Sequence, residues 1–389
     1  MLNTAFEPWP SFTQEEADAV SRVLLSNKVN YWTGQECREF EKEFAQFAET
    51  KYAVALANGT VALDVALKAL GIGAGDDVIV TSRTFLASAS SIVTAGANPI
   101  FADVELDSQN ISAQTIEAVL TPNTKAIICV HLAGWMCDMD PIMQLAADKG
   151  LYVIEDCAQA HGAKYKGKSA GSIGHVAAWS FCQDKIMTTG GEGGMVTTND
   201  EELWKKMWSY KDHGKNFDSI YNKQHPPGFR WLHDSFGTNW RMMEMQAVIG
   251  RIQLKKMPEW TRKRTENAKR ILACFEDSPY FTVHTPDADY THAWYKCYVQ
   301  VNTEALPADW SRDRIMAEIN ALAVPCFSGS CSEVYLEHAF DATPWRPVQR
   351  LQNAQKLGET SLMFLVHPTL TENNIQTTEN ALRQVISRI

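Results

Sequence analysis

Short apolar runs alternate with amphipathic stretches through the first two thirds of the chain. The apolar runs are rich in Val, Ile and Ala, which is typical of buried strands, whereas the stretches between them have the spacing of helices. Strands that are almost continuously apolar and separated by helices indicate a mostly parallel sheet with helices on both faces. We predict its strands at residues 52–57, 77–81, 98–104, 125–131, 151–156, 175–182 and 195–198.

The pattern changes after a polar, proline-containing loop at about residues 214–238. The stretch from Met242 to about Lys269 reads as a long helical pair that links two domains. A predicted strand at 293–301 and helices at 311–322 and 371–389 then indicate a small α+β domain. We therefore predict a large α/β domain over 1–250, N-terminal helices included, and a small C-terminal α+β domain with the linking helix over 251–389.

Composition narrows the class of protein. The chain has 389 residues and a formal net charge of −10, which disfavours a nucleic acid or an anionic membrane surface as a general partner. Its nine cysteines are scattered without a C-x-x-C pair, a usage that fits a reducing compartment. The N-terminus has no signal-peptide pattern, and no apolar run approaches the ~18–20 residues of a membrane span. We expect a soluble, cytoplasmic protein.

Several predicted strands are followed, at their C-terminal ends, by residues that could bind a ligand, and doubly wound sheets bind ligands at this edge. Each has an ordinary alternative: a capped turn, core packing, an ion pair or a solvated lysine. Their order along the chain matches what pyridoxal 5′-phosphate requires: a helix N-terminus for its phosphate, a stacking face, an acid for its ring nitrogen, and a lysine for its aldehyde. The residues are Asn58-Gly59-Thr60, Phe85, Asp156, Ser180 and Lys185.

The sequence resembles the DegT/DnrJ/EryC1/StrS family of sugar aminotransferases, which have the type I fold of the pyridoxal phosphate enzymes. The resemblance covers nearly the whole chain and rests on a set of short segments in order. These are NGTVAL at 58–63, TFLAS at 84–88, HLAG at 131–134, DCAQAHG at 156–162, SFCQDK followed by TTGGEGG at 180–194, and NWRMMEMQA at 239–247. The glycine-rich TTGGEGG segment is one residue longer than the commonest family spacing.

The resemblance implies roles for residues around the cofactor ring. Lys185 would bind the cofactor covalently and then shuttle the proton, and Asp156 would pair with the ring nitrogen. Gln159 would lie near the phenolic oxygen, and Phe85 would stack on the ring. Because relatives that carry His at the lysine position act as dehydratases, Lys185 favours transamination.

The resemblance also implies a phosphate site and a dimer. Asn58, Gly59, Thr60 and Ser180 would hold the phosphate of their own subunit. Asn239 would reach the phosphate of the neighbouring subunit, which implies a homodimer with shared active sites.

The implied reaction moves an amino group, with L-glutamate as the expected donor, to a keto- or aldehydo-sugar for surface glycan or lipopolysaccharide synthesis. The sugar is either nucleotide-linked or an 8-oxo-3-deoxy-manno-octulosonate, because the 324–340 segment resembles the branch that makes 8-amino-3,8-dideoxy-manno-octulosonate. Tentative substrate contacts are His131, Arg230, Arg241 and Glu333, with His233 and Arg346 as further candidates for an anionic group. The segment around Cys326 and Cys331 has a packed-loop alternative.

Other functions remain open from the sequence. The same fold would serve a regulator that binds pyridoxal phosphate without catalysis, or a dehydratase. A nucleotide-binding oxidoreductase is disfavoured because GIGAG at 71–75 follows a helix instead of a strand. Zinc ligands at Cys129, His131 and Cys137 lack a fourth partner, so we expect no metal.

Overall fold

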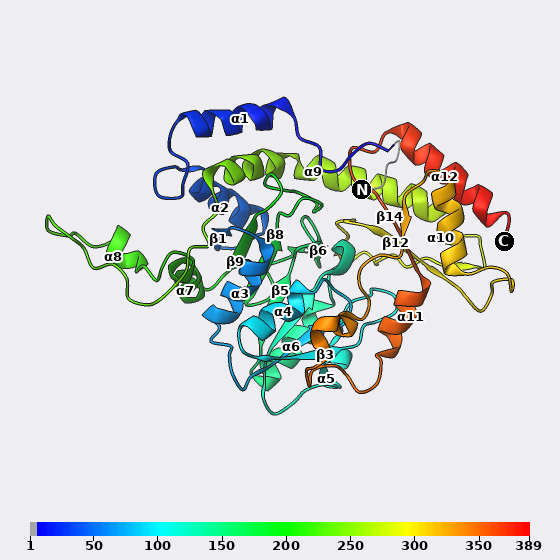
Figure 1. Cartoon of the computed structure of the whole chain (residues 1–389), viewed down its shortest axis with the longest axis horizontal. Coiled ribbons are helices and arrows are strands. Elements are labelled where there is room, and N and C mark those ends of the chain that lie inside the picture. Colours follow the sequence, from blue (N-terminus) through cyan, green and yellow to red (C-terminus); the bar gives the residue numbers. More distant parts are fainter. Residues whose placement is uncertain (1–5) are drawn as a thin grey trace.

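The computed structural model of the protein describes residues 6–389, and its centre is a seven-stranded sheet (Figure 1). The strand order is β1-β9-β8-β5-β4-β2-β3, and the strands are parallel except β9, which runs antiparallel between β1 and β8. The seven predicted strands are all present. Their bounds are β1 (Tyr52–Leu56), β2 (Asp77–Thr81), β3 (Asn98–Ala102), β4 (Thr124–Val130), β5 (Tyr152–Asp156), β8 (Val176–Ser180) and β9 (Gly194–Thr198).

Helices cover both faces of this sheet, because alternate strand residues point to opposite sides and both sides are apolar. Val153 and Trp179 pack with side chains of α2, α6 and α9, whereas Ile154 and Ala178 pack with α3, α4 and α7. The predicted type I fold is confirmed. The helices of the region are α1 (Gln14–Leu25), α2 (Glu36–Phe47), α3 (Gly59–Ala69), α4 (Ala87–Thr94), α5 (Ala113–Glu117), η1 (Leu132–Gly134), α6 (Met139–Lys149), α7 (Glu201–Lys211), α8 (Phe217–Tyr221) and α9 (Glu244–Ala273).

A smaller antiparallel sheet, in the order β10-β12-β14-β13, forms the C-terminal part with its own apolar core. Its strands are β10 (Phe281–Thr282), β12 (Cys297–Val301), β13 (Cys326–Phe327) and β14 (Ser361–Phe364). The remaining helices are α10 (Arg312–Ala321), η2 (Val334–Leu336), η3 (His338–Phe340), α11 (Gln352–Thr360) and α12 (Glu372–Ile386). A three-stranded sheet, β11-β6-β7, joins the two parts and comprises β6 (Lys164–Tyr165), β7 (Lys168–Ser169) and β11 (Tyr290–Thr291).

The stretch predicted as a helical pair is one continuous helix, α9, which corrects that prediction. Pro258 lies inside α9 without ending it. Apolar residues of α9 contribute both to the core beside the large sheet and to the core of the small sheet, so one helix serves both parts. The division into two domains at residue 250 stays a prediction. Residues 1–5 of the predicted large domain lie outside the described residues.

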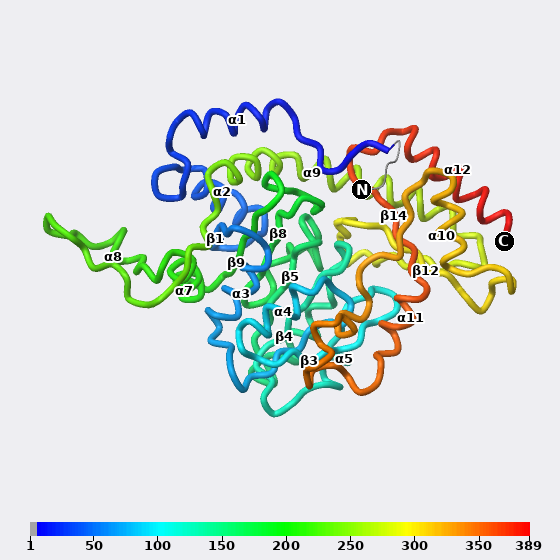
Figure 2. The backbone as a smooth tube through the Cα atoms, viewed as in Figure 1, coloured from blue at the N-terminus to red at the C-terminus, as the bar shows by residue number. Residues whose placement is uncertain are grey.

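Residues 213–238, which we call the arm, leave the body after α7 and return before α9 (Figure 2). The arm contains the short helix α8 and projects from one end of the molecule. The arm carries three highly exposed aromatic side chains, Phe229, Trp231 and Phe236, the last of them 99% exposed. The predicted loop is therefore a projecting segment with exposed apolar side chains.

Candidate active site

A cavity of about 840 Å³ lies at the C-terminal ends of β1, β5 and β8. Part of its lining comes from the small sheet, through Tyr295, Tyr298 and Phe327. The cavity brings together all the predicted cofactor residues except Asn239. These are Asn58, Gly59, Thr60, Phe85, Asp156, Gln159, Ser180 and Lys185.

The N-terminus of α3 forms the first wall of the cavity. Asn58 caps the helix, and its Oδ1 accepts a hydrogen bond from the N–H of Val61 at 3.0 Å. A Cβ atom on Gly59 would lie 2.5 Å from Cβ of Ser180, so the close approach of β8 leaves room for glycine alone. The first N–H groups of the helix have no partners within it, and they make this cradle suited to a phosphate.

Asp156 lies at the end of β5 and is buried, but it lines the cavity. Its Oδ2 accepts a hydrogen bond from the Ser88 hydroxyl at 2.8 Å, and its Oδ1 accepts one from the N–H of Ala158 at 3.1 Å. Each carboxylate oxygen has two lone pairs, so this side chain retains acceptor capacity toward the cavity. A protonated ring nitrogen could donate a hydrogen bond to it.

Gln159 and Phe85 lie on other parts of the cavity wall. Oε1 of Gln159 accepts a hydrogen bond from the N–H of Ala133 at 2.8 Å, which leaves its amide nitrogen as the group for a ligand oxygen. Ala133 adopts a left-handed conformation with φ of 57°. Phe85 is 71% exposed although it is a large apolar residue. An aromatic face left open at a cavity fits stacking on a ligand ring.

Lys185 is partly buried on the loop that follows β8. Its backbone carbonyl accepts a hydrogen bond from Trp9 Nε1 at 2.8 Å, which ties the N-terminal segment to this loop. Its ammonium group lies 5.2 Å from the ring centroid of Tyr295, and the Tyr295 hydroxyl donates to Asp184. The predicted lysine, acid and phosphate cradle therefore share one cavity, and these residues fit pyridoxal phosphate.

The tentative substrate contacts do not line this cavity. Arg241 forms an ion pair with Asp212 at 2.7 Å, and Arg230 is exposed on the arm. Glu333 is buried and is bound by Tyr335 and Arg350. Each is either paired elsewhere or exposed outside the cavity lining, and its contact with a substrate stays a prediction.

Three further candidates also lie outside the cavity lining. Arg346 donates to the carbonyl of Tyr335 and pairs with Asp341, so it holds a loop. His233 forms a backbone bridge to Lys215. Asn239 is exposed and forms a backbone bridge to Asp212, and its predicted contact with a neighbouring subunit stays a prediction.

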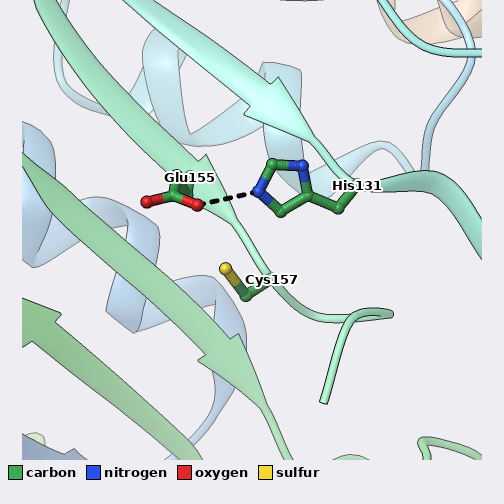
Figure 3. Close-up of side chains that lie close together, drawn as sticks. All are labelled: His131, Glu155 and Cys157. Carbon is green, nitrogen blue, oxygen red and sulfur yellow. Dashed lines mark hydrogen bonds and ion pairs between the residues drawn. The ribbon is translucent and has the colours of Figure 1, made fainter. Parts of the chain in front are cut away.

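His131 is fully buried beside Glu155 and Cys157, on the side of β5 away from the cavity (Figure 3). Its Nδ1 accepts a hydrogen bond from the N–H of Cys137 at 3.2 Å, so Nε2 carries the proton and donates to Glu155 at 2.9 Å. His131 is therefore buried outside the cavity lining, and its substrate contact stays a prediction. Sequence reasoning missed Glu155, which precedes Asp156 and has the opposite orientation.

Glu155 is saturated with hydrogen bonds. Its Oε1 accepts from the N–H groups of Ile173 and Gly174, and its Oε2 accepts from Gly171 and His131, at distances of 2.6–2.9 Å. Burial raises the pKa of this carboxyl, but the hydrogen bonds outweigh burial and hold the pKa below its usual value. His131, Glu155 and Cys157 are residue types that can bind a metal. The ring nitrogens of His131 and the carboxylate oxygens of Glu155 are, however, already hydrogen-bonded within the protein.

The comparisons with known proteins agree with this site. The sequence pattern of the DegT/DnrJ/EryC1/StrS aminotransferase family matches residues 10–383. A GDP-perosamine synthase of Caulobacter vibrioides is 38% identical over 382 residues, which are 97% of each chain.

Two solved structures are also similar. An aminotransferase from Psychrobacter cryohalolentis is 66% identical, with a TM-score of 0.98 over 99% of both chains. S. venezuelae DesV, in complex with a ketimine intermediate, is 31% identical, with a TM-score of 0.86 over 97% of this chain and 95% of that one. Across residues 6–389, no helix is both long and apolar enough to cross a membrane.

Proposed function

The chain belongs to the DegT/DnrJ/EryC1/StrS aminotransferase family, whose members are pyridoxal phosphate-dependent sugar aminotransferases, and from this premise we propose that it transfers an amino group from L-glutamate to a keto- or aldehydo-sugar. The observation that carries the proposal is the convergence of Lys185, Asp156 and the N-terminus of α3 on one cavity. The amino group would enter a sugar used for surface glycan synthesis.

The residues of the cavity divide the work of binding and catalysis. The N–H groups at the start of α3, with the hydroxyl groups of Thr60 and Ser180, would bind the cofactor phosphate. Phe85 would fix the plane of the ring, and the amide nitrogen of Gln159 would donate to its phenolic oxygen. When bound, pyridoxal phosphate supplies an aldehyde and an electron-withdrawing ring through which an amino group can pass from donor to acceptor.

Two side chains would handle protons. The carboxylate of Asp156 would hold a proton on the ring nitrogen, and Ser88 and Ala158 fix the orientation of that carboxylate. The amine of Lys185 would bind the cofactor and, once displaced by the donor, would take a proton from the donor's Cα and deliver it as a general acid. The loop after β8 holds Lys185 within reach of the cavity.

For the acceptor, similarity to the Caulobacter GDP-perosamine synthase favours a nucleotide-linked sugar. An 8-oxo-3-deoxy-manno-octulosonate is the second candidate, because of the 324–340 segment. A panel of GDP-, UDP- and dTDP-linked keto-sugars and this octulosonate, each incubated with enzyme and L-glutamate, separates the two by which compound gains nitrogen in mass spectrometry. Conversion of the octulosonate alone would overturn the nucleotide-linked choice.

The main experiment replaces Lys185. We expect Lys185→Ala to abolish turnover and to remove the adduct that borohydride traps, because the variant lacks the amine proposed to bind the cofactor. Lys125→Ala, a substitution of an exposed lysine on β4, is the matched control and should keep both. Full turnover by the Lys185→Ala protein would refute the mechanism.

A half-reaction separates transamination from the alternatives. With L-glutamate alone, an aminotransferase converts its bound cofactor to the pyridoxamine form, which the absorption spectrum reports. A regulator that only binds the cofactor would leave the spectrum unchanged. A dehydratase would release water from the sugar without moving nitrogen to it.

The proposed assembly is a homodimer with shared active sites. The exposed aromatic residues Trp231 and Phe236 of the arm favour a covering partner, and Asn239 lies just beyond the arm. Mixing Lys185→Ala subunits with Asn239→Ala subunits tests this, because one site of each mixed dimer would then be intact. Activity well above that of either variant alone is expected, and no gain on mixing would refute shared sites.

A further inference from the structure

A second cavity of about 570 Å³ adjoins the first and shares five of its lining residues, Asp184, Tyr295, Lys296, Phe327 and Leu365. Its other walls come from the N-terminal segment around Trp9, from α9 and from the end of β14. Trp9 also binds the carbonyl of Lys185. The second cavity is thus built against the loop that carries the expected catalytic lysine.

Arg264 of α9 lines this cavity with its charge unpaired. The side chain is only 1% exposed, and its Nε and Nη2 have no hydrogen-bond partner within residues 6–389. Nη1 reaches the carbonyls of Trp294 and Tyr295 at 3.3 and 3.4 Å. Burial lowers the pKa of Arg264 to about 9. Because buried polar groups are nearly always bonded, two free donors on one guanidinium require an explanation.

Lys296 supplies a second cation beside both cavities. Its ammonium group lies 4.8 Å from the ring centroid of Tyr295. Burial, together with repulsion from Arg264 and Lys185 and against the opposing influence of Asp184, lowers its pKa to about 8. The positive groups therefore repel one another in this region, a cost that a bound anion would remove.

The negative groups that face the cavity do not neutralise Arg264. Glu7 and Asp184 line it, but both residues are exposed, and Asp184 accepts the hydroxyl of Tyr295. His367 stacks on Trp9, and burial lowers its pKa to about 3, so it is neutral at pH 7. The guanidinium also lies 5.0 Å from the ring centroid of Trp9. Arg264 is thus a buried cation with no ion-pair partner among residues 6–389.

We propose that Arg264 and Lys296 bind a carboxylate of a substrate at a subsite next to Lys185. The free Nε and Nη2 lie on one edge of the guanidinium, and that edge matches the two oxygens of a carboxylate. The inference rests on the proposed aminotransferase function. The carboxylate belongs either to the amino donor, as the side-chain carboxylate of L-glutamate, or to an acidic sugar acceptor.

The test compares Lys296→Met with wild-type holoenzyme, with Lys125→Met as the control at an exposed lysine. A donor carboxylate predicts that the KM for L-glutamate rises at least about tenfold, while the KM for L-glutamine, which lacks that charge, stays the same. A sugar carboxylate predicts instead that only the KM for the acceptor rises. Unchanged KM values for both substrates would overturn the subsite.

A binding measurement keeps the subsite separate from the aminotransferase reaction. Calorimetry with glutarate should show binding to the wild-type holoenzyme and to Lys125→Met, and an affinity at least about tenfold lower for Lys296→Met. Arg264→Lys keeps a charge but loses the paired donors, so it should weaken glutarate binding in protein whose melting curve remains cooperative. Equal glutarate affinity in all four proteins refutes the subsite even if transamination is confirmed. Glutarate binding that depends on Lys296 supports it even if the half-reaction fails.

Discussion

Glu155 and Asp156 are neighbouring acids at the end of the same strand, yet their surroundings are opposite. Asp156 faces the cavity with two hydrogen bonds and keeps acceptor capacity for a ligand. Glu155 faces the other side of β5 and accepts four hydrogen bonds from the protein (Figure 3). The alternation of strand residues alone separates a group open to a ligand from a group closed within the structure.

The difference teaches how to recognise a functional acid in a buried setting. Burial and charge are the same for both residues, so neither property distinguishes them. The number of hydrogen bonds accepted from the protein distinguishes them, because a carboxylate whose lone pairs are all occupied cannot accept another from a ligand. By the same measure, Arg264 belongs with Asp156, since two of its donors have no partner within residues 6–389, and His131 belongs with Glu155.

The largest expected effect is the loss of stability in Glu155→Gln. The new amide nitrogen would face N–H donors on one side of the group, and the carboxylate charge that these donors solvate would be lost. We expect the free energy of unfolding to fall by about 3–5 kcal/mol. Urea denaturation measures it, and a fall below about 1 kcal/mol would break the distinction between the two acids.

Asp156→Asn should show the opposite behaviour. The amide can keep the bonds to Ser88 and Ala158, so we expect a melting curve close to that of the wild type. It cannot hold a proton on the ring nitrogen as a carboxylate does, so the half-reaction with L-glutamate should slow by at least about a hundredfold. Stopped-flow absorbance measures this rate, and a loss of less than tenfold would contradict the assigned role.

His131→Phe tests whether the hydrogen bonds around Glu155 serve stability and not catalysis. The change removes one donor from Glu155 and leaves the N–H of Cys137 without its acceptor. We expect the free energy of unfolding to fall by about 1–3 kcal/mol. The half-reaction rate of the protein that remains folded should match the wild type. A selective loss of rate in fully folded protein would return His131 to the active site.

The smallest expected effect is the contribution of Glu155 to the pH dependence of stability. Because its pKa in the folded protein is below the ordinary value of 4.5, the ionised carboxylate stabilises the fold fully above pH 4.5. That stability is lost as the pH falls through the folded pKa, at about 1.4 kcal/mol for each unit of pKa depression. The difference in unfolding free energy between wild type and Glu155→Gln should therefore shrink below pH 4.5. A constant difference down to pH 3 would contradict this.

The sequence was most informative where local pattern and chemistry coincide. Apolar runs predicted all the strands of the large sheet, and the motifs around Asn58, Asp156 and Lys185 predicted residues that meet in one cavity. These residues follow strand ends, and parallel strands bring their C-terminal ends to one edge. The order of these residues along the chain is therefore enough to predict that they meet.

Prediction failed where the answer depends on contacts between distant segments. Arg264 is one of several charged residues on α9, and its burial against Trp9 and the small sheet has no local sign in the sequence. The contacts of Glu333 with Tyr335 and Arg350 likewise have no local sign in the sequence, and its substrate contact stays a prediction. The helical pair proved to be one helix because Pro258 does not end α9.

Pro258 gives α9 a consequence for movement. Proline has no N–H, so the carbonyl one turn earlier, at Leu254, loses its usual helical partner, and the helix resists bending least at this point. Arg264 lies on the C-terminal side of Pro258, together with the turns that pack on the small sheet, while the N-terminal turns pack beside the large sheet. Bending of α9 at Pro258 would therefore move Arg264 toward or away from Lys185. Binding of the substrate carboxylate would then depend on the distance between the two sheets.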